Sequence, residues 1–411
     1  MNNLAWNYVP LTSAVEIYDS LRQPVNSKER AKRIEKKKES DLFPYYGATG
    51  QVGYIDDFLI DGEYVLLGED GAPFLDALAE KAYIIKGKSW VNNHAHILQS
   101  KTSNRFLCFY LNYFNYKNYV SGTTRLKLTQ ARMKQIPVPV PSLSEQERIV
   151  ARIEELFSEL DKAVETLKTT KQQLSVYRQA VLKEAFEGSF TVHRSCDLKL
   201  EWSSEEETKN LPAIPKEWRY IALSKLGDLG RGKSKHRPRN DPKLFEEGKY
   251  PFLQTGEVKA AKQYITEFSK MYGEFGLQQS KLWPKGTLCI TIAANIAETA
   301  FLGIDACFPD SVVGFTPYEN IIPEYIKHFI ESQKLRLWAF APATAQKNIN
   351  LDTLENLIVP YCSVEEQKDV VAEIEARMST CDSIEKTVDA ALQQAEAMRQ
   401  SILKQAFEGG L

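Results

Sequence analysis

The chain has 411 residues, which is too long for one ordinary domain and predicts at least two hydrophobic cores. A hydrophobic content of 43% and a charged content of 26% are typical of a soluble globular protein, no apolar run approaches the roughly 18 residues of a membrane span, and the first ten residues lack the features of a signal peptide. The net charge of −2 does not exclude a polyanionic partner, because Lys and Arg are concentrated locally at 28–38 and 231–239.

Residues 1–142 are predicted to form a β-rich mixed domain. Short apolar runs such as EYVLLG at 63–68 are typical of strands. The run KERAKRIEKKK at 28–38 is strongly basic, and it is either a phosphate-contacting surface or a solvated helix face, since Glu29, Glu35 and Glu39 are interleaved with it.

Residues 143–188 are predicted to form one long helix. Ser142 precedes it with Glu145 three residues on, which is the spacing of a capping box, and Gly188 ends it. Apolar residues follow at alternating steps of four and three, which is a heptad seam. The seam packs either on its own domain or, as we prefer, on a second such helix. Its main members are Ile149, Ile153, Leu156, Leu160, Leu167 and Leu174.

Residues 189–215 are polar, contain two prolines and are predicted to be a linker, and residues 216–362 repeat the first domain loosely. Trp218 and Leu223 keep the five-residue step of Trp6 and Leu11, and YPFLQTG at 250–256 resembles FPYYGATG at 43–50. The apolar runs TLCITIAA and VVGF again predict strands.

The stretch GDLGRGKSKHRPRNDP at 227–242 contains a literal match to the phosphate-binding loop GxxxxGK[ST]. Such a loop requires a helix that begins at the GKS, and Pro238 and Pro242 oppose that helix. We therefore expect no nucleotide site here. The alternating basic residues suit an extended segment along a phosphate backbone, and the alternative is a solvated charged loop.

Residues 363–411 repeat the first long helix at a constant offset of 221 residues, from IPVPVPSLSEQ and LIVPYCSVEEQ to RQAVLKEAFEG and RQSILKQAFEG. The chain therefore consists of two tandem halves. The second seam contains Val370, Ile374, Ile384, Val388, Met398 and Ile402, and we expect the two matching helices to pack on each other.

Catalytic and metal-binding patterns are weak. The six cysteines (Cys108, Cys196, Cys289, Cys307, Cys362 and Cys381) include no CxxC pair, which argues against structural zinc and fits a reducing cytosol. The alternating His94 and His96 are more typical of a structural role than of a metal pair. The chain contains no Pro-Pro, so it lacks the base-holding motif of adenine methyltransferases, and we see no nuclease motif.

The SxxEQ-to-AFEG helices, the Trp-x4-Leu openings and the PYYGATG and PFLQTG segments together resemble the DNA-specificity subunit of type I restriction-modification systems, over essentially the whole length. The resemblance implies an α+β fold. Two β-rich target-recognition domains, at 1–142 and 216–362, would be joined by spacer helices at 143–188 and 363–411 that pair as an antiparallel coiled coil with pseudo-two-fold symmetry.

The resemblance also implies a cytoplasmic, non-catalytic subunit that reads a bipartite double-stranded DNA target, one half per recognition domain. Two modification subunits would supply methylation with S-adenosylmethionine, and restriction or translocase subunits would use ATP and magnesium. This chain would hold no cofactor or metal. The alternative is a coiled-coil scaffold that binds two protein partners without reading DNA, but a scaffold would not need basic segments in both domains.

Base reading requires hydrogen-bonding side chains at groove edges, while Lys and Arg contact phosphates. Tyrosines among the candidates have the alternative of a core position. The predicted DNA-binding residues are Arg22, Lys28, Arg30, Lys32, Arg33, Tyr45, Tyr46 and Thr49 in the first domain and Arg231, Lys233, Lys235, Arg237, Arg239, Gln254 and Thr255 in the second.

Overall fold

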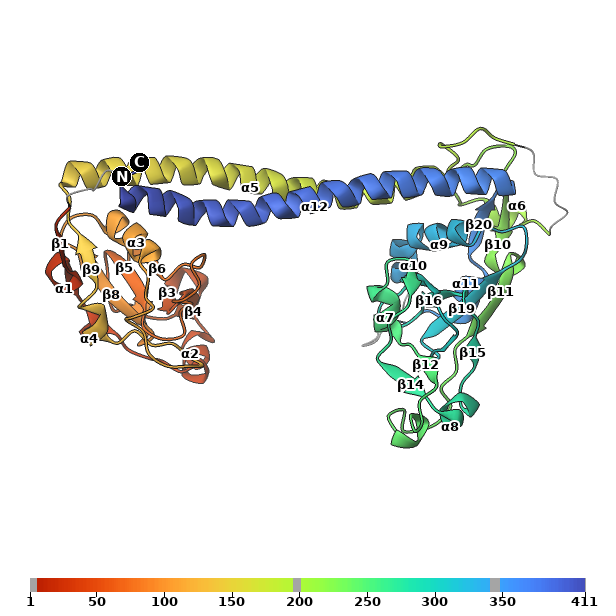
Figure 1. The fold of residues 1–411 in the computed structure, drawn as a ribbon, viewed down its shortest axis with the longest axis horizontal. Helices are drawn as coiled ribbons and strands as arrows, with labels where there is room; N and C mark the ends of the chain where they lie inside the picture. The colour runs from red at the N-terminus through yellow and green to blue at the C-terminus, as the bar shows by residue number, and fades with distance from the viewer. Residues whose placement is uncertain (1–5, 195–200, 341–347, 411) are drawn as a thin grey trace. The chain divides into compact units, whose positions relative to one another are not determined.

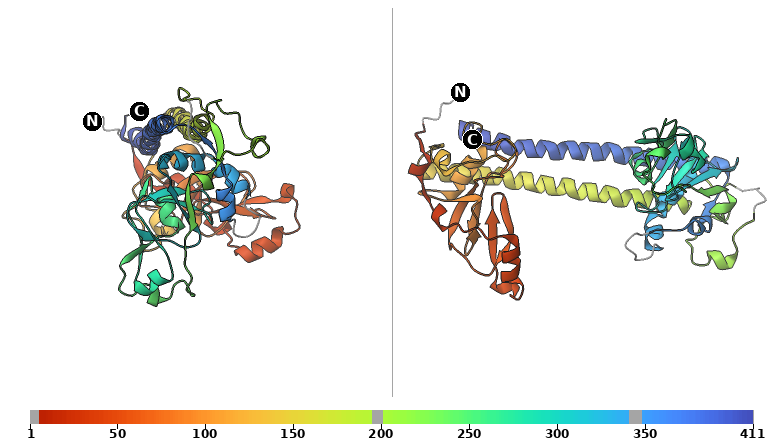
Figure 2. Two further views of the ribbon diagram at one scale, coloured as in Figure 1. Left: turned by 90° about the vertical axis from the view of Figure 1, so that its right-hand side faces the viewer. Right: turned by 90° about the horizontal axis from the view of Figure 1, so that it is seen from below.

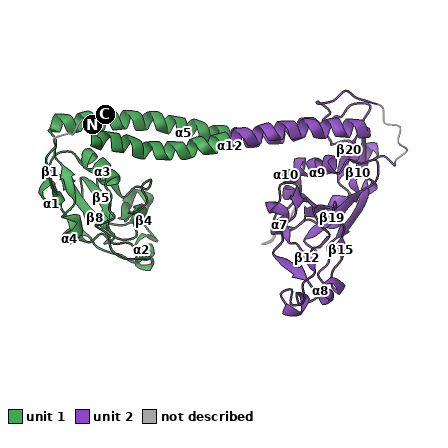
Figure 3. Cartoon of the chain, viewed as in Figure 1, with its two compact units in different colours: residues 1–170, 387–411 green, residues 171–386 purple. Residues whose placement is uncertain are grey.

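A computed structural model describes residues 6–194, 201–340 and 348–410. The chain divides into two compact units, residues 1–170 with 387–411 and residues 171–386 (Figure 3). Each unit therefore contains one globular domain and parts of both long helices. None of the helices in the described ranges combines the length and apolar character that a membrane span requires.

The first globular domain consists of small sheets with short helices between them (Figure 1). A four-stranded sheet has the order β2-β8-β5-β6, a three-stranded sheet has the order β4-β3-β7, and β1 pairs with β9. The strands are β1 (Tyr8–Pro10), β2 (Val15–Ile17), β3 (Phe43–Gly47), β4 (Gly50–Ile55), β5 (Glu63–Gly68), β6 (Ala82–Lys86), β7 (Trp90–Val91), β8 (Ala95–Ser100) and β9 (Pro137–Pro139). The helices are α1 (Leu11–Ala14), α2 (Ser27–Ile34), α3 (Asn104–Tyr113) and α4 (Gln130–Met133), with 3₁₀ turns η1 (Asp19–Leu21) and η2 (Glu39–Asp41).

The second globular domain has a five-stranded sheet of order β11-β19-β16-β17-β13, a four-stranded sheet of order β14-β12-β18-β15, and the pair β10-β20. Its strands are β10 (Arg219–Ala222), β11 (Gly227–Arg231), β12 (Tyr250–Phe252), β13 (Tyr264–Ile265), β14 (Lys270–Tyr272), β15 (Leu282–Trp283), β16 (Leu288–Thr291), β17 (Thr299–Leu302), β18 (Ala306–Cys307), β19 (Val312–Pro317) and β20 (Ile358–Tyr361). Its helices are α6 (Glu205–Thr208), α7 (Thr255–Ala260), α8 (Glu274–Gln278), α9 (Pro323–Ser332), α10 (Lys334–Phe340) and α11 (Leu351–Glu355), with 3₁₀ turns η3 (Leu223–Lys225) and η4 (Pro242–Leu244).

The two domains share one topology. The order β2-β8-β5-β6 in the first matches β11-β19-β16-β17 in the second, and β4-β3-β7 matches β14-β12-β18, including a parallel pair in each. The Trp-x4-Leu motif has a common role, because the backbone N–H groups of the fully buried Leu11 and Leu223 donate to the carbonyls of Ile136 and Leu357. The expected repetition of the domains is confirmed.

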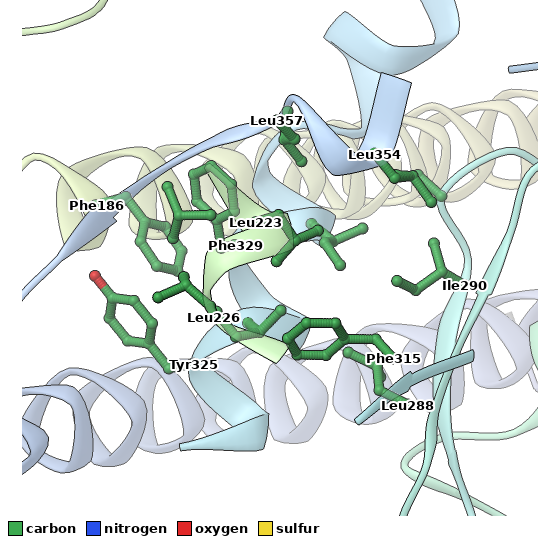
Figure 4. Close-up of a cluster of buried hydrophobic side chains, with 14 of the residues drawn as sticks. Phe186, Leu223, Leu226, Leu288, Ile290, Phe315, Tyr325, Phe329, Leu354 and Leu357 are labelled. Atoms are coloured by element: carbon green, nitrogen blue, oxygen red, sulfur yellow. The ribbon is translucent and has the colours of Figure 1, made fainter. Parts of the chain in front are cut away.

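The core of the second domain continues onto the long helices. Figure 4 shows Leu223, Leu288 and Phe315 from the domain packing in one cluster with Phe186 from the first long helix. Phe186 packs edge-on against Tyr325 and Phe329 of α9. In the first unit its repeat equivalent, Phe407, packs in the same way against α3. The AFEG motif therefore ends each long helix in an aromatic anchor.

The long helices α5 (Leu143–Phe186) and α12 (Val364–Glu408) pack side by side within each unit (Figures 1 and 2). In the second unit Lys171 and Arg178 of α5 pair with Glu385 and Asp382 of α12, at 3.7 and 2.7 Å, so residue numbers fall along α12 as they rise along α5. The helices are therefore antiparallel, as expected. In the first unit Asp161 of α5 pairs with Arg399 of α12. This pair is the repeat equivalent of Arg178 with Asp382, because the residues of each type lie 221 positions apart.

The predicted seam needs a correction at two positions. Eight of its twelve members are buried, and Leu156 and Leu167 are half-buried, but Ile384 and Met398 are 41% and 44% exposed. The reason is geometric: at 3.6 residues per turn, a residue ten positions beyond Ile374 lies about 80° from its face, whereas the eleventh lies within about 20°. Accordingly Glu385 and Arg399 turn inward and form the interhelical ion pairs. The buried members are Ile149, Ile153, Leu160, Leu174, Val370, Ile374, Val388 and Ile402.

A buried glutamine attaches each long helix to its globular domain. The amide of Gln146 donates to the carbonyl of Pro141 at 3.0 Å and accepts from the Thr102 hydroxyl at 3.0 Å. The amide of Gln367 donates to the carbonyl of Cys362 at 2.9 Å and accepts from the Ile322 backbone N–H at 2.9 Å. These contacts explain the glutamine of both SxxEQ motifs. The serine half of the expected cap forms in both helices, while the Glu145 carboxylate pairs with Arg148.

The described parts of the predicted linker, 189–194 and 201–215, belong to the second unit. Thr191, His193 and the backbone of Arg194 donate to the buried carboxylate of Glu366, which also accepts from the Trp218 indole. Residues 191–194 are therefore fastened to the start of α12. Cys196 lies outside the described residues, and the other five cysteines are buried.

Candidate nucleic-acid interface

The basic run of the first domain forms α2, which divides into an anchoring face and an exposed face. Arg30 stacks on the Tyr45 ring at 4.6 Å, and Arg33 pairs with Asp56 at 2.6 Å and stacks on Trp90. Lys28 and Lys32 are exposed and, in the described part of the chain, make no ion pair. The structure thus leaves the lysines available for an anion and commits the arginines to the fold.

Arg22 and Tyr45 are wrongly placed among the predicted DNA contacts. Arg22 is mostly buried in ion pairs with Asp19 and Glu69, and Tyr45 is 2% exposed with its hydroxyl bonded to the Val25 backbone. Both side chains are bound within the first domain. For Tyr45 this is the core position expected from the sequence as the alternative to a DNA contact. Tyr46 is half-buried, and burial raises its pKa. Thr49 lies exposed at the tip of the β3–β4 hairpin and remains a predicted contact.

The loop after β11 is an extended edge, and no phosphate-binding loop forms. Residues 232–241 contain no helix, and Ser234 is buried. The glycines serve close packing instead, because a Cβ on Gly227 would clash with the Thr316 carbonyl and one on Gly232 with the Pro309 carbonyl. The GKS residues therefore do not begin the helix that a phosphate-binding loop requires.

This edge is held by its backbone while its side chains alternate. The N–H groups of Gly232, Lys233 and Lys235 donate to Val312, Phe308 and Gln279, and the Ser280 hydroxyl donates to the Lys233 carbonyl. Gly232 and Ser234 face inward, whereas the two lysines are exposed. Alternating exposure on a fixed backbone is the arrangement expected of a segment that follows a polyanion.

The five cations of this loop are not equivalent. Arg231 donates to the Asp310 carbonyl, Arg239 pairs with the Asp310 carboxylate at 2.8 Å, and Arg237 donates to the Ser234 carbonyl at 2.6 Å. The ammonium groups of Lys233 and Lys235 make no ion pair within the described ranges. Nearby, the hydrogen bond from the His236 ring lowers the pKa of Asp241. Among the described residues only Arg239 is therefore neutralised by a carboxylate, and the lysines are the cations of the loop whose side chains are not held by a bond to the fold.

Gln254 and Thr255 lie on a separate element. Gln254 is exposed at the N-terminal end of α7, where its backbone N–H donates to Glu257, and Thr255 is half-buried. Sequence reasoning missed Lys281, which follows the Ser280 that binds the basic loop and lies 3.6 Å from the Trp283 ring centroid. A solitary lysine so far along the chain from the loop carries no signal in the sequence, and the hydrogen bonds of Gln279 and Ser280 to the loop reveal its proximity.

The alternating histidines are structural. The ring of His96 is fully buried and bonds the Asp19 carboxylate at 2.7 Å and the Leu128 carbonyl at 2.9 Å, while His94 bonds Asp70 at 2.6 Å. Within the described residues, no group of three His, Cys, Asp or Glu side chains is placed to hold a metal ion. The two rings therefore bind separate carboxylates and do not converge on one site.

The two basic segments occupy the same point of the shared topology. The segment that contains α2 lies between β2 and β3, and the loop 232–241 lies between the equivalent strands β11 and β12. The sequence model of the type I restriction modification DNA specificity domain matches residues 6–175 and 215–394, one copy in each half. The chain belongs to this family.

Relatives of this specificity family cover nearly the whole chain. A putative type I restriction enzyme specificity subunit from Haemophilus influenzae is 27% identical over 94% of this chain and 91% of its own length. Among solved structures, the HsdS subunit from Thermoanaerobacter tengcongensis has a TM-score of 0.56 at 17% identity over 99% of this chain and 98% of its own, which supports the fold. A structure reported for complex assembly of the type I R-M system has a TM-score of 0.71 at 17% identity, with 100% and 99% of the two chains covered. The predicted family, fold and non-catalytic class are confirmed.

Proposed function

We propose that this chain is the DNA-specificity subunit of a type I restriction-modification complex and reads a bipartite double-stranded target, one half per recognition domain. The observation that carries the proposal is the repetition: two domains of one topology each present an exposed basic segment between equivalent strands. A scaffold that binds only proteins gives no reason for such segments at both equivalent positions.

The available lysines suit phosphate contacts. Lys28 and Lys32 lie one helical turn apart on α2, and Lys233 and Lys235 alternate along an extended backbone. Phosphate contacts release counterions and make binding fall steeply with salt. Such contacts position the DNA, whereas discrimination between sequences requires contacts with base edges.

The long helices are proposed to position partner subunits. Val176, Tyr177, Ile384 and Met398 are between 41% and 70% exposed on helices whose other face is paired. Apolar side chains at such positions suit a protein partner, and we assign them to two modification subunits, with restriction or translocase subunits completing the complex. S-adenosylmethionine, ATP and magnesium would be bound by those subunits, in the cytoplasm where the DNA lies.

The test is a binding assay on the assembled complex. Electrophoretic shift with specific and unrelated duplexes should show sequence-dependent binding that weakens with salt, and Lys233→Ala with Lys235→Ala should weaken it for both duplexes. Lys209→Ala with Lys216→Ala, which removes the same charge from exposed positions outside the basic segments, is the matched control. Binding that ignores sequence, salt and the loop substitutions alike would favour the protein scaffold.

A further inference from the structure

The β3–β4 hairpin of the first domain has one buried face and one partly exposed face. Tyr45 and Ile55 are 2% and 0% exposed and form a small core with Trp90. Val52 and Tyr54 are 47% and 49% exposed, and Gln51 is exposed beside them. The pairing register shifts opposite Tyr45 and Tyr46, so Val52 is the extra residue of a bulge. Bulges redirect side chains next to functional sites.

The Gln51 amide is held in place but only partly used. Its Nε2 donates to the Gly53 carbonyl at 3.1 Å, which fixes the side chain against its own strand. One N–H and the Oε1 atom remain without a partner in the described part of the chain. One donor beside one acceptor is the pair that a glutamine offers to N7 and the N6 amino group of adenine in the major groove.

The neighbours of Gln51 complete a surface for an A·T pair. Val52 is half-exposed, and its methyl groups are of the kind that contacts the thymine C5-methyl group. Helix α2 contacts β4, which places Lys28 and Lys32 on the element beside the hairpin. A two-stranded ribbon fits the major groove, about 12 Å wide, and lysines alongside it suit the flanking phosphates.

We propose that the β3–β4 hairpin enters the major groove and that Gln51 and Val52 read one A·T pair of the half-site bound by the first domain. This inference rests on the proposed function. It names base-reading residues that neither the sequence motifs nor the basic segments indicate, and it assigns α2 to phosphates alone.

The experiment measures the affinity of the assembled complex for its target and for a panel in which each specified base pair is changed singly. For Gln51→Ala, discrimination should fall about 5- to 100-fold at one A·T position of one half-site and stay unchanged elsewhere. Gln51→Glu keeps the side-chain length but loses the amide donor, so it should relax the same position. Gln135→Ala, at an exposed glutamine outside the hairpin, is the matched control and should leave the panel unchanged.

The outcomes separate the two proposals. Wild-type discrimination with an unchanged panel for both Gln51 variants would overturn the hairpin assignment and leave the proposed function intact. Absence of sequence discrimination by the wild-type complex would overturn the proposed function itself. Uniform weakening at every position, with Gln135→Ala unaffected, would make Gln51 a phosphate or structural residue and also overturn its assignment to base reading.

Discussion

Replacing the buried glutamines that attach the long helices should destabilise the two units unequally. In Gln367→Ala, the Cys362 carbonyl and the Ile322 N–H both lose their partners inside the second unit. Each unsatisfied buried group costs about 1–3 kcal/mol, so the loss should be about 2–6 kcal/mol. In Gln146→Ala, the Thr102 hydroxyl is exposed and regains a partner in water, so only the Pro141 carbonyl contributes and the loss should be about 1–3 kcal/mol.

The assay is native-state hydrogen exchange, read on the amides of α3 and α9, because a chain with two units need not unfold in one transition. Gln393→Ala, at an exposed position of α12, is the control and should change stability by no more than about 0.5 kcal/mol. A loss for Gln367→Ala that does not exceed the control, or that is smaller than the loss for Gln146→Ala, would refute the reasoning.

Three further predictions concern acid stability, salt and spacing. Burial alone would raise the pKa of Glu331, but the bonds from His328 and Lys327 outweigh burial and hold this pKa at about 2. The stability that the Glu331 carboxylate contributes should therefore be present above about pH 4.5 and be lost as the pH falls towards 2. Acid titration of the wild type and of Glu331→Gln checks this prediction. Lys233→Ala with Lys235→Ala should reduce the slope of log affinity against log salt by about 1.8, and an unchanged slope would exclude phosphate contacts there. Inserting four residues after Thr170 adds about 6 Å of helix, so methylation mapping should find the gap between half-sites lengthened by one or two base pairs; an unchanged gap with full activity would exclude a spacer role.

The repeated architecture was predictable because it is encoded locally. The serine caps and the seven-residue spacing of buried positions each act within a few turns of helix. The constant offset of 221 residues shows that both long helices carry these same local signals. The exposure of Ile384 and Met398 was harder to predict, since an alternating pattern of four and three does not reveal which of two adjacent residues faces the partner. The ion pair of Arg399 with Asp161 settles that choice, and it joins residues far apart in sequence.

The candidate interface was only partly predictable for a similar reason. The basic composition marks both segments in the sequence, and the structure places them at equivalent points of the topology. Composition could not separate Lys233, which is unpaired in the described chain, from Arg239, which is neutralised by Asp310. Nor could it show that Ile55 of β4 is buried while Gln51, four residues earlier in the same strand, is exposed, because the bulge at Val52 breaks the alternation of the strand.

The central claim is that each recognition domain reads one half of a bipartite target. The most direct test replaces residues 216–362 by the corresponding domain of a relative and maps adenine methylation across the genome of a host that carries the complete system. The account predicts a new bipartite motif in which one half is retained, the other is changed and the gap is the same. Loss or change of both halves in an active complex, or retention of both, would contradict it.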